Sequence, residues 1–104
     1  MSERAEMLKS LLAEDPNNKF ARYGLAMEYV KEGQLDTAVS EFRSLIASDP
    51  NYCAAYFHAG QTLEKSGEIE EARTMYERGI EAATRTGDAH TRSELQGALE
   101  LLPL

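Results

Sequence analysis

The sequence predicts an all-α fold in which about six antiparallel helices stack one on another as a solenoid. Three observations predict it: a repeat with a period of 34 residues, apolar residues at helical spacing within each period, and Gly or Pro residues between the apolar segments. One helical repeat cannot bury its apolar face alone, so neighbouring repeats are expected to share a continuous core.

The repeat appears when the sequence is compared with itself at an offset of 34 residues. Asp15-Pro16-Asn17 recurs as Asp49-Pro50-Asn51, and Gly33 recurs as Gly67. Because such matches fall on turn residues and apolar positions, we interpret them as a structural repeat. Other matching pairs are Leu11 and Leu45, Ala38 and Ala72, and Ile46 and Ile80.

Each period is predicted to contain two helices separated by a glycine. Gly33 and Gly67 suit a helix end that turns through a left-handed residue. Pro50 cannot lie inside a helix, so the second helix of the first unit ends before it. Asn51 is then expected to cap the following helix, and Asp88 to cap the last one. The predicted helices cover residues 3–14, 18–32, 35–48, 52–66, 69–84 and 88–101.

This pattern resembles the tetratricopeptide repeat, a helix–turn–helix unit of 34 residues with small, aromatic and apolar residues at set positions. Two residues depart from the family pattern: Arg22 stands where a large apolar residue is usual, and Thr84 replaces the closing proline. The resemblance implies that the motif residues pack repeat on repeat. In the first unit they are Leu25, Ala26, Tyr29, Ala38 and Phe42, followed by Pro50, and in the second unit Tyr56, Ala59, Gly60, Leu63, Ala72 and Tyr76.

The resemblance also implies a right-handed α–α superhelix that forms a single domain over residues 1–104. In that domain residues 3–14 form an N-terminal half-repeat helix, and residues 18–50 and 52–85 form two full repeats. Residues 88–102 form a capping helix, because the terminal elements of solenoids cover the core of the outermost repeat. Its predicted buried stripe is Leu95, Ala98, Leu99 and Leu102.

The first helix of each repeat lines the concave surface in this family, and the resemblance implies the same here. Phe20, Tyr23 and Met27 form a second stripe opposite the core stripe of that helix, and such a helix is buried on two faces or binds something. We therefore expect a shallow peptide-binding groove. In the alternative, Phe20 and Tyr23 pack on the N-terminal helix and only Met27 is exposed. The candidate groove residues are Phe20, Tyr23, Met27, Lys31, Phe57, Gln61, Lys65 and Arg92.

Composition argues against several classes of partner. Eleven Lys and Arg against eighteen Asp and Glu give a net charge of -7, so we expect neither nucleic acid nor a membrane surface as a partner. No apolar run approaches the roughly 20 residues that a membrane-spanning helix needs. The polar, acidic start of the chain is unlike a secretory signal, which predicts a cytoplasmic location.

Few residues are suited to metal or nucleophilic chemistry. Cys53, His58 and His90 are the only Cys and His residues, and a zinc site needs about four ligands. Cys53 and His58 lie five residues apart on one predicted helix, so their side chains are expected to point in different directions. We therefore expect no metal, no cofactor and no enzymatic activity.

Two functions then compete. The first is an adaptor whose concave groove binds a peptide or helix of another protein. The second is a structural module in which the apolar stripe, or the tail over residues 99–104, pairs with a second copy as a weak homodimer. An adaptor keeps Phe20, Tyr23 and Met27 exposed in the free protein, whereas a dimer hides them.

Overall fold

The computed structural model describes residues 2–104, and all regular secondary structure in this range is α-helical. The predicted all-α fold is confirmed, and each predicted helix end lies within two residues of the observed one. The six helices are α1 (Glu3–Glu14), α2 (Lys19–Lys31), α3 (Leu35–Ser48), α4 (Cys53–Lys65), α5 (Ile69–Thr86) and α6 (Ala89–Glu100).

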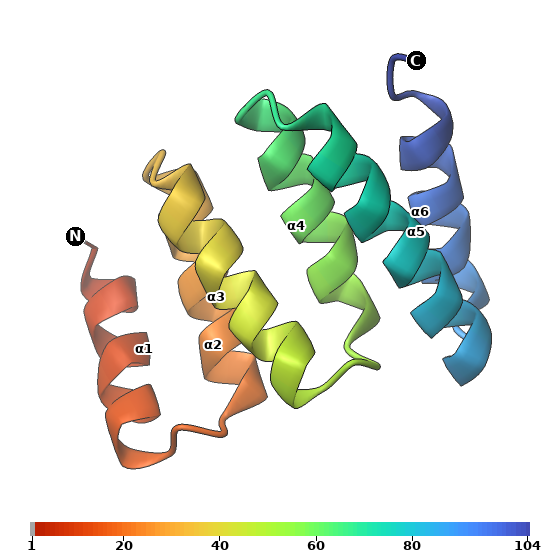
Figure 1. The fold of residues 1–104 in the computed structure, drawn as a ribbon. Helices are drawn as coiled ribbons and strands as arrows, with labels where there is room; N and C mark the ends of the chain where they lie inside the picture. The colour runs from red at the N-terminus through yellow and green to blue at the C-terminus, as the bar shows by residue number, and fades with distance from the viewer. Residues whose placement is uncertain (1) are drawn as a thin grey trace.

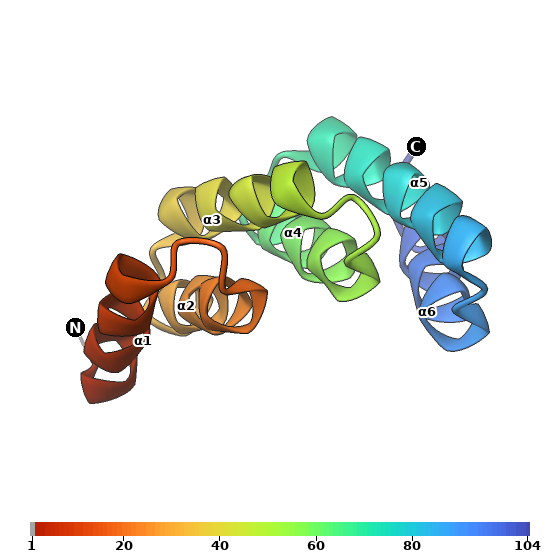
Figure 2. The same ribbon diagram turned by 90° about the horizontal axis from the view of Figure 1, so that it is seen from below.

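Consecutive helices run antiparallel and pack on each other, and α4 also contacts α6 (Figure 1). In the view from below, α3 and α5 form the outer layer of a curved array (Figure 2). Helices α2, α4 and α6 form the inner layer, and α1 flanks α2 at the N-terminal end. The inner layer therefore lines the concave side of the superhelix.

Glycines end three of the helices. Gly33, Gly67 and Gly87 have φ angles of 78°, 80° and 75°, in the left-handed region that other residues rarely adopt. At the end of α2, the N–H groups of Gly33 and Gln34 donate to carbonyls of the last helical turns, at 3.0 and 2.9 Å. This is a Schellman motif, which satisfies the last carbonyls of the helix and turns the chain back.

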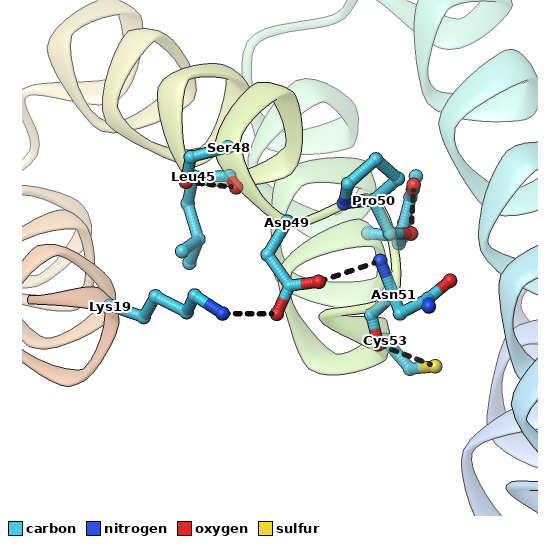
Figure 3. Close-up of polar contacts among 8 residues, drawn as sticks. Lys19, Leu45, Ser48, Asp49, Pro50, Asn51 and Cys53 are labelled. Carbon is cyan, nitrogen blue, oxygen red and sulfur yellow. Dashed lines mark hydrogen bonds and ion pairs between the residues drawn. The ribbon is translucent and has the colours of Figure 1, made fainter. Parts of the chain in front are cut away.

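The repeated Asp-Pro-Asn segment makes the turn between α3 and α4 (Figure 3). The Asp49 carboxylate accepts a hydrogen bond from the Asn51 N–H at 3.1 Å, and its other oxygen lies 3.2 Å from the Lys19 ammonium of α2. The first copy of the segment forms the same local bond, from the Asn17 N–H to Asp15. The sequence repeat at this turn is therefore a repeat of hydrogen bonding.

The prediction that Asn51 caps α4 is wrong. Its side-chain oxygen accepts a hydrogen bond from Nε of Arg85 on α5 at 2.9 Å, so it ties two helices together instead. The N-cap residue of α4 is Tyr52, which makes no side-chain cap bond. In contrast, Asn18 caps α2, and Asp88 caps α6 as predicted.

Helix α5 is longer than its counterpart α3. Helix α3 ends at Ser48 because Pro50 follows, whereas Thr84 stands at the corresponding position of α5. Threonine does not stop a helix, so α5 continues to Thr86 and ends at Gly87. The predicted end at residue 84 is therefore two residues short, and α6 is displaced from the 34-residue register.

Two glycines lie where a neighbouring side chain leaves no room for a Cβ atom. A Cβ atom at Gly60 of α4 would lie 2.2 Å from Cε1 of Tyr76 on α5, whose side chain is fully buried. A Cβ atom at Gly79 of α5 would lie 2.7 Å from Cβ of Tyr56 and 2.9 Å from Leu95 of α6. Other buried residues at motif positions are Leu25, Ala26, Tyr29, Ala38, Phe42, Ala59, Leu63 and Ala72.

Replacing Gly60 with Ala should destabilise the fold by about 1–3 kcal/mol, because the buried Tyr76 ring has to shift to admit the methyl group. Urea unfolding followed by circular dichroism measures the change. Gly97 of α6 is the matched control, since a Cβ atom there meets nothing within 4 Å. Gly97→Ala should stabilise the fold by about 0.5–1 kcal/mol through helix propensity alone. Equal effects of the two substitutions would contradict this account.

Candidate functional site

Helix α2 uses three of its sides for packing. A Cβ atom at Gly24 would meet Leu8 of α1 at 3.2 Å, Arg22 forms an ion pair with Glu41 of α3 at 2.8 Å, and Tyr23 packs toward α4. No helix within residues 2–104 covers the fourth side, which faces the concave surface. By helical spacing, this side carries Phe20, Met27 and Lys31.

The structure decides between the two interpretations of Phe20 and Tyr23. Phe20 is 69% exposed, so it does not pack on the N-terminal helix. Tyr23 is half-buried, and its ring lies 5.5 Å from that of Tyr52 and 5.7 Å from that of His58. Phe20 is therefore left uncovered by α1, Tyr23 packs toward Tyr52 and His58, and Met27 is partly buried against the core.

An aromatic row crosses from α2 to α4. His58 occupies its centre, with its ring 5.7 Å from Tyr23 and 5.4 Å from Phe57, and it stacks at 6.4 Å on the buried Phe42 of α3. Edge-to-face and stacked rings at these distances attract each other and hold a fixed geometry. The row links Tyr23 and Phe57, two of the predicted groove residues, through His58.

Gln61 is half-buried and helps to hold α4 against α5. Its amide donates a hydrogen bond to the Tyr76 hydroxyl at 2.9 Å, and that hydroxyl donates to the Glu64 carboxylate. Burial raises the pKa of Tyr76 well above its ordinary value, with the Glu64 carboxylate adding to the effect. Gln61 and Glu64 therefore satisfy the one polar atom of a buried side chain.

A shallow hollow of about 320 Å³ lies between α4 and α6. Its α4 wall contains Phe57 and Gln61, which belong to the predicted groove. Its other wall comes from α6 and its C-cap, and none of these residues was among the predicted groove residues: Ser93, Glu94, Gly97, Ala98 and Leu101.

A tetratricopeptide repeat model matches the sequence twice, over residues 5–56 and 29–95. The two matches together extend over most of the chain. The chain belongs to the tetratricopeptide repeat family. The hollow between α4 and α6 lies in the part of the chain that the second match covers, except for its residues beyond position 95.

Solved structures of similar proteins have the same fold. A tetratricopeptide repeat domain protein from Salinibacter ruber is 36% identical, with a TM-score of 0.77 over 82% of this chain and 86% of that one. A protein from Bordetella parapertussis is 33% identical, with a TM-score of 0.82 over 96% of this chain and 87% of its own. SycD, the type III secretion translocator chaperone of Yersinia enterocolitica, is 21% identical with a TM-score of 0.84, over 92% of this chain and 67% of its own, which shows a shared fold alone. No curated protein matches.

Arg92 is exposed on α6 and is not among the residues that line the hollow beside Phe57 and Gln61. Arg92 precedes Glu94 by two residues, and a helix turns about 100° per residue, so the two side chains point to nearly opposite sides of α6. The extra length of α5 explains the difference, because the 34-residue period no longer relates α6 to α4. Leu95, which this period would align with Gln61, is fully buried instead.

Lys31 and Lys65 remain exposed at the ends of α2 and α4. A cation is favourable there, because the carbonyls at a helix C-terminus carry partial negative charge. Both lysines are therefore favourably placed at these helix ends and exposed to solvent.

The cysteine is part of the helix packing. Cys53 is buried, and its thiol donates to the carbonyl of Asn51 at 3.4 Å. Within residues 2–104, no group of three or more His, Cys, Asp or Glu side chains could hold a metal ion.

None of the helices in the same range is both long enough and apolar enough to cross a membrane.

Burial lowers the pKa of His58 below its ordinary value near 6.5, although the Glu94 carboxylate opposes the shift. The unfolded chain therefore binds more protons than the folded protein just below pH 6.5. The stability that the neutral imidazole provides is present above that pH and is lost as the pH falls toward the lowered pKa. Between pH 7.5 and 5.5, the melting temperature of wild type should fall further than that of His58→Gln.

The exposed His90 provides the matched control for this experiment, since His90→Gln should retain the pH dependence of wild type. An NMR titration of the imidazole protons gives the pKa of His58 directly. A value at or above 6.5 would show that burial does not dominate at this residue.

Proposed function

We propose that this chain is a non-catalytic protein-interaction module that binds a peptide or helix of a partner on its concave surface. The observation that carries the proposal is Phe20 of α2, whose side chain is 69% exposed; α2 belongs to the inner layer that lines the concave side (Figure 2). A large aromatic side chain left in water gains free energy when a partner covers it. Curved solenoids generally use their concave surfaces for binding.

The composition of the surface supports this proposal. Phe20, Met27 and Phe57 provide apolar contact area, and aromatic residues and Met are enriched in protein interfaces. Met is adaptable because its chain is unbranched and its sulfur is polarizable. Lys31 and Lys65 supply a polar edge, so the surface has the apolar centre and charged rim of an interface.

A symmetric homodimer is the second candidate function. It is favoured by exposed apolar side chains on the same chain: Leu101 is 86% exposed, and Leu104 is also exposed. In a two-fold dimer, the same surface patch of each copy forms the interface. Phe20 or the C-terminal leucines of both copies would then be buried in it.

Sedimentation equilibrium over a wide concentration range separates the two functions. An adaptor should retain a mass near 11.6 kDa throughout, because its groove awaits a different chain. A mass that doubles at micromolar protein would instead support the homodimer. In that case Phe20→Lys and Leu101→Lys should identify the dimer surface, according to which of them restores the monomer.

The adaptor proposal also predicts which variants lose binding. Peptides of about twelve residues are selected from a random phage-displayed library on the wild-type protein. The double variant Phe20→Lys, Met27→Lys should bind them at least about tenfold more weakly, because it places two charges in the apolar centre. Ala47→Lys is the matched control, since Ala47 is exposed on α3 in the outer layer. Equal loss in both proteins would contradict a concave binding surface.

A further inference from the structure

We infer that the hollow between α4 and α6 is an anchor site for one aliphatic side chain of a bound partner segment, and that Glu94 pairs there with a Lys or Arg beside that side chain. The inference rests on the proposed function and specifies the chemistry of the partner. It is carried by three features of the hollow: a glycine that packing does not require, apolar walls, and a single charge.

Gly97 is the first feature. It lies inside α6, where glycine is less stable than alanine because it gains no side-chain contacts and has more freedom to lose. Gly60 and Gly79 are required by the close approach of other side chains, but a Cβ atom at Gly97 would meet nothing within 4 Å. The missing side chain therefore serves no contact within the described fold, and its effect is to deepen the hollow.

The walls are the second feature. Phe57 forms one side of the hollow, and Ala98 and Leu101 form the other. Leu101 is 86% exposed, so its side chain can fold onto an incoming group at little cost. Small apolar hollows with a few polar groups at the rim bind apolar side chains and orient them through the polar groups.

The charge of the hollow is the third feature. Glu94 is the only charged residue among those that line it. The Glu94 side chain is 47% exposed and lies 3.6 Å from His90, a contact that is an ion pair only when the imidazole is protonated. An exposed pair of this kind is weak, so the carboxylate remains available to a partner. The net charge of -7 also favours a basic segment over an acidic one.

The C-terminal tail of a second copy does not have this chemistry. Residues 93–104 are rich in leucine but contain no Lys or Arg, so the tail would bring no cation to Glu94. The segment around Phe20 does contain Lys19 and Arg22, but Arg22 is already held in a largely covered ion pair with Glu41 at 2.8 Å. A basic segment of a different polypeptide therefore fits the hollow better than the C-terminal tail does.

The test uses the random peptide library and two leucine variants of α6. Gly97→Leu fills the hollow, whereas Gln96→Leu adds the same side chain to the neighbouring exposed position, which does not line it. Peptides selected on wild type should share an aliphatic residue within about four positions of a Lys or Arg. Their affinity for Gly97→Leu should fall at least about tenfold, and their affinity for Gln96→Leu should not change.

The charge is tested separately with Glu94→Gln, which should weaken binding several-fold at low salt and much less at high salt. Glu100→Gln is the control, because Glu100 is exposed on α6 outside the hollow. Urea unfolding checks that Gly97→Leu is at least as stable as wild type, as expected from the removal of a helix-interior glycine.

Four outcomes would overturn the inference. Selected peptides that are acidic or lack an aliphatic residue would contradict the proposed preference for an aliphatic side chain beside a Lys or Arg. Peptides that lose affinity for the Phe20 and Met27 double variant but bind Gly97→Leu normally would contradict the anchor site. The proposed binding on the concave surface would still be supported. A homodimer that Gly97→Leu dissociates would make a second copy the occupant. A library that yields no binding peptide would contradict the anchor site and the proposed function together.

Discussion

The close approach of α4 to α5 at Gly60 is the constraint on which much of the rest of the structure depends. No side chain fits at this position, because the buried ring of Tyr76 occupies the space. Because the Tyr76 side chain is fully buried, its hydroxyl requires hydrogen-bond partners inside the protein. Gln61 and Glu64 provide them. Gly79 repeats the same close approach between α5 and its neighbours. The spacing of the last three helices is therefore set by two positions that lack a side chain.

This packing determines which residues remain for binding. Gln61 lines the hollow between α4 and α6, but its amide already donates a hydrogen bond to the Tyr76 hydroxyl. Phe20 has no such engagement, and His58 joins Tyr23 to Phe57 in a rigid aromatic row. Membership of the tetratricopeptide repeat family accounts for the stacked helices. The chemistry of the concave surface comes from the residues that this stacking leaves unused.

The absence of a proline near the end of α5 affects where α6 begins. Thr84 allows the helix to continue to Thr86, and α6 starts later than the 34-residue period requires. With this start, Leu95 of α6 lies in the core, and Glu94 and Gly97 line the hollow with α4. A single departure from the family pattern thus changes which side chains the last helix presents to a partner.

The sequence by itself determined the number and type of the helices, their breaks and the family, because these depend on local properties. Helical spacing, left-handed glycines and the proline after α3 act within a few residues and can be recognised from the chain alone. The exposure of Phe20, the bond from Arg85 to Asn51 and the hollow between α4 and α6 came only from the tertiary structure. Each of these depends on how helices distant in the sequence pack on one another, which local sequence properties do not specify.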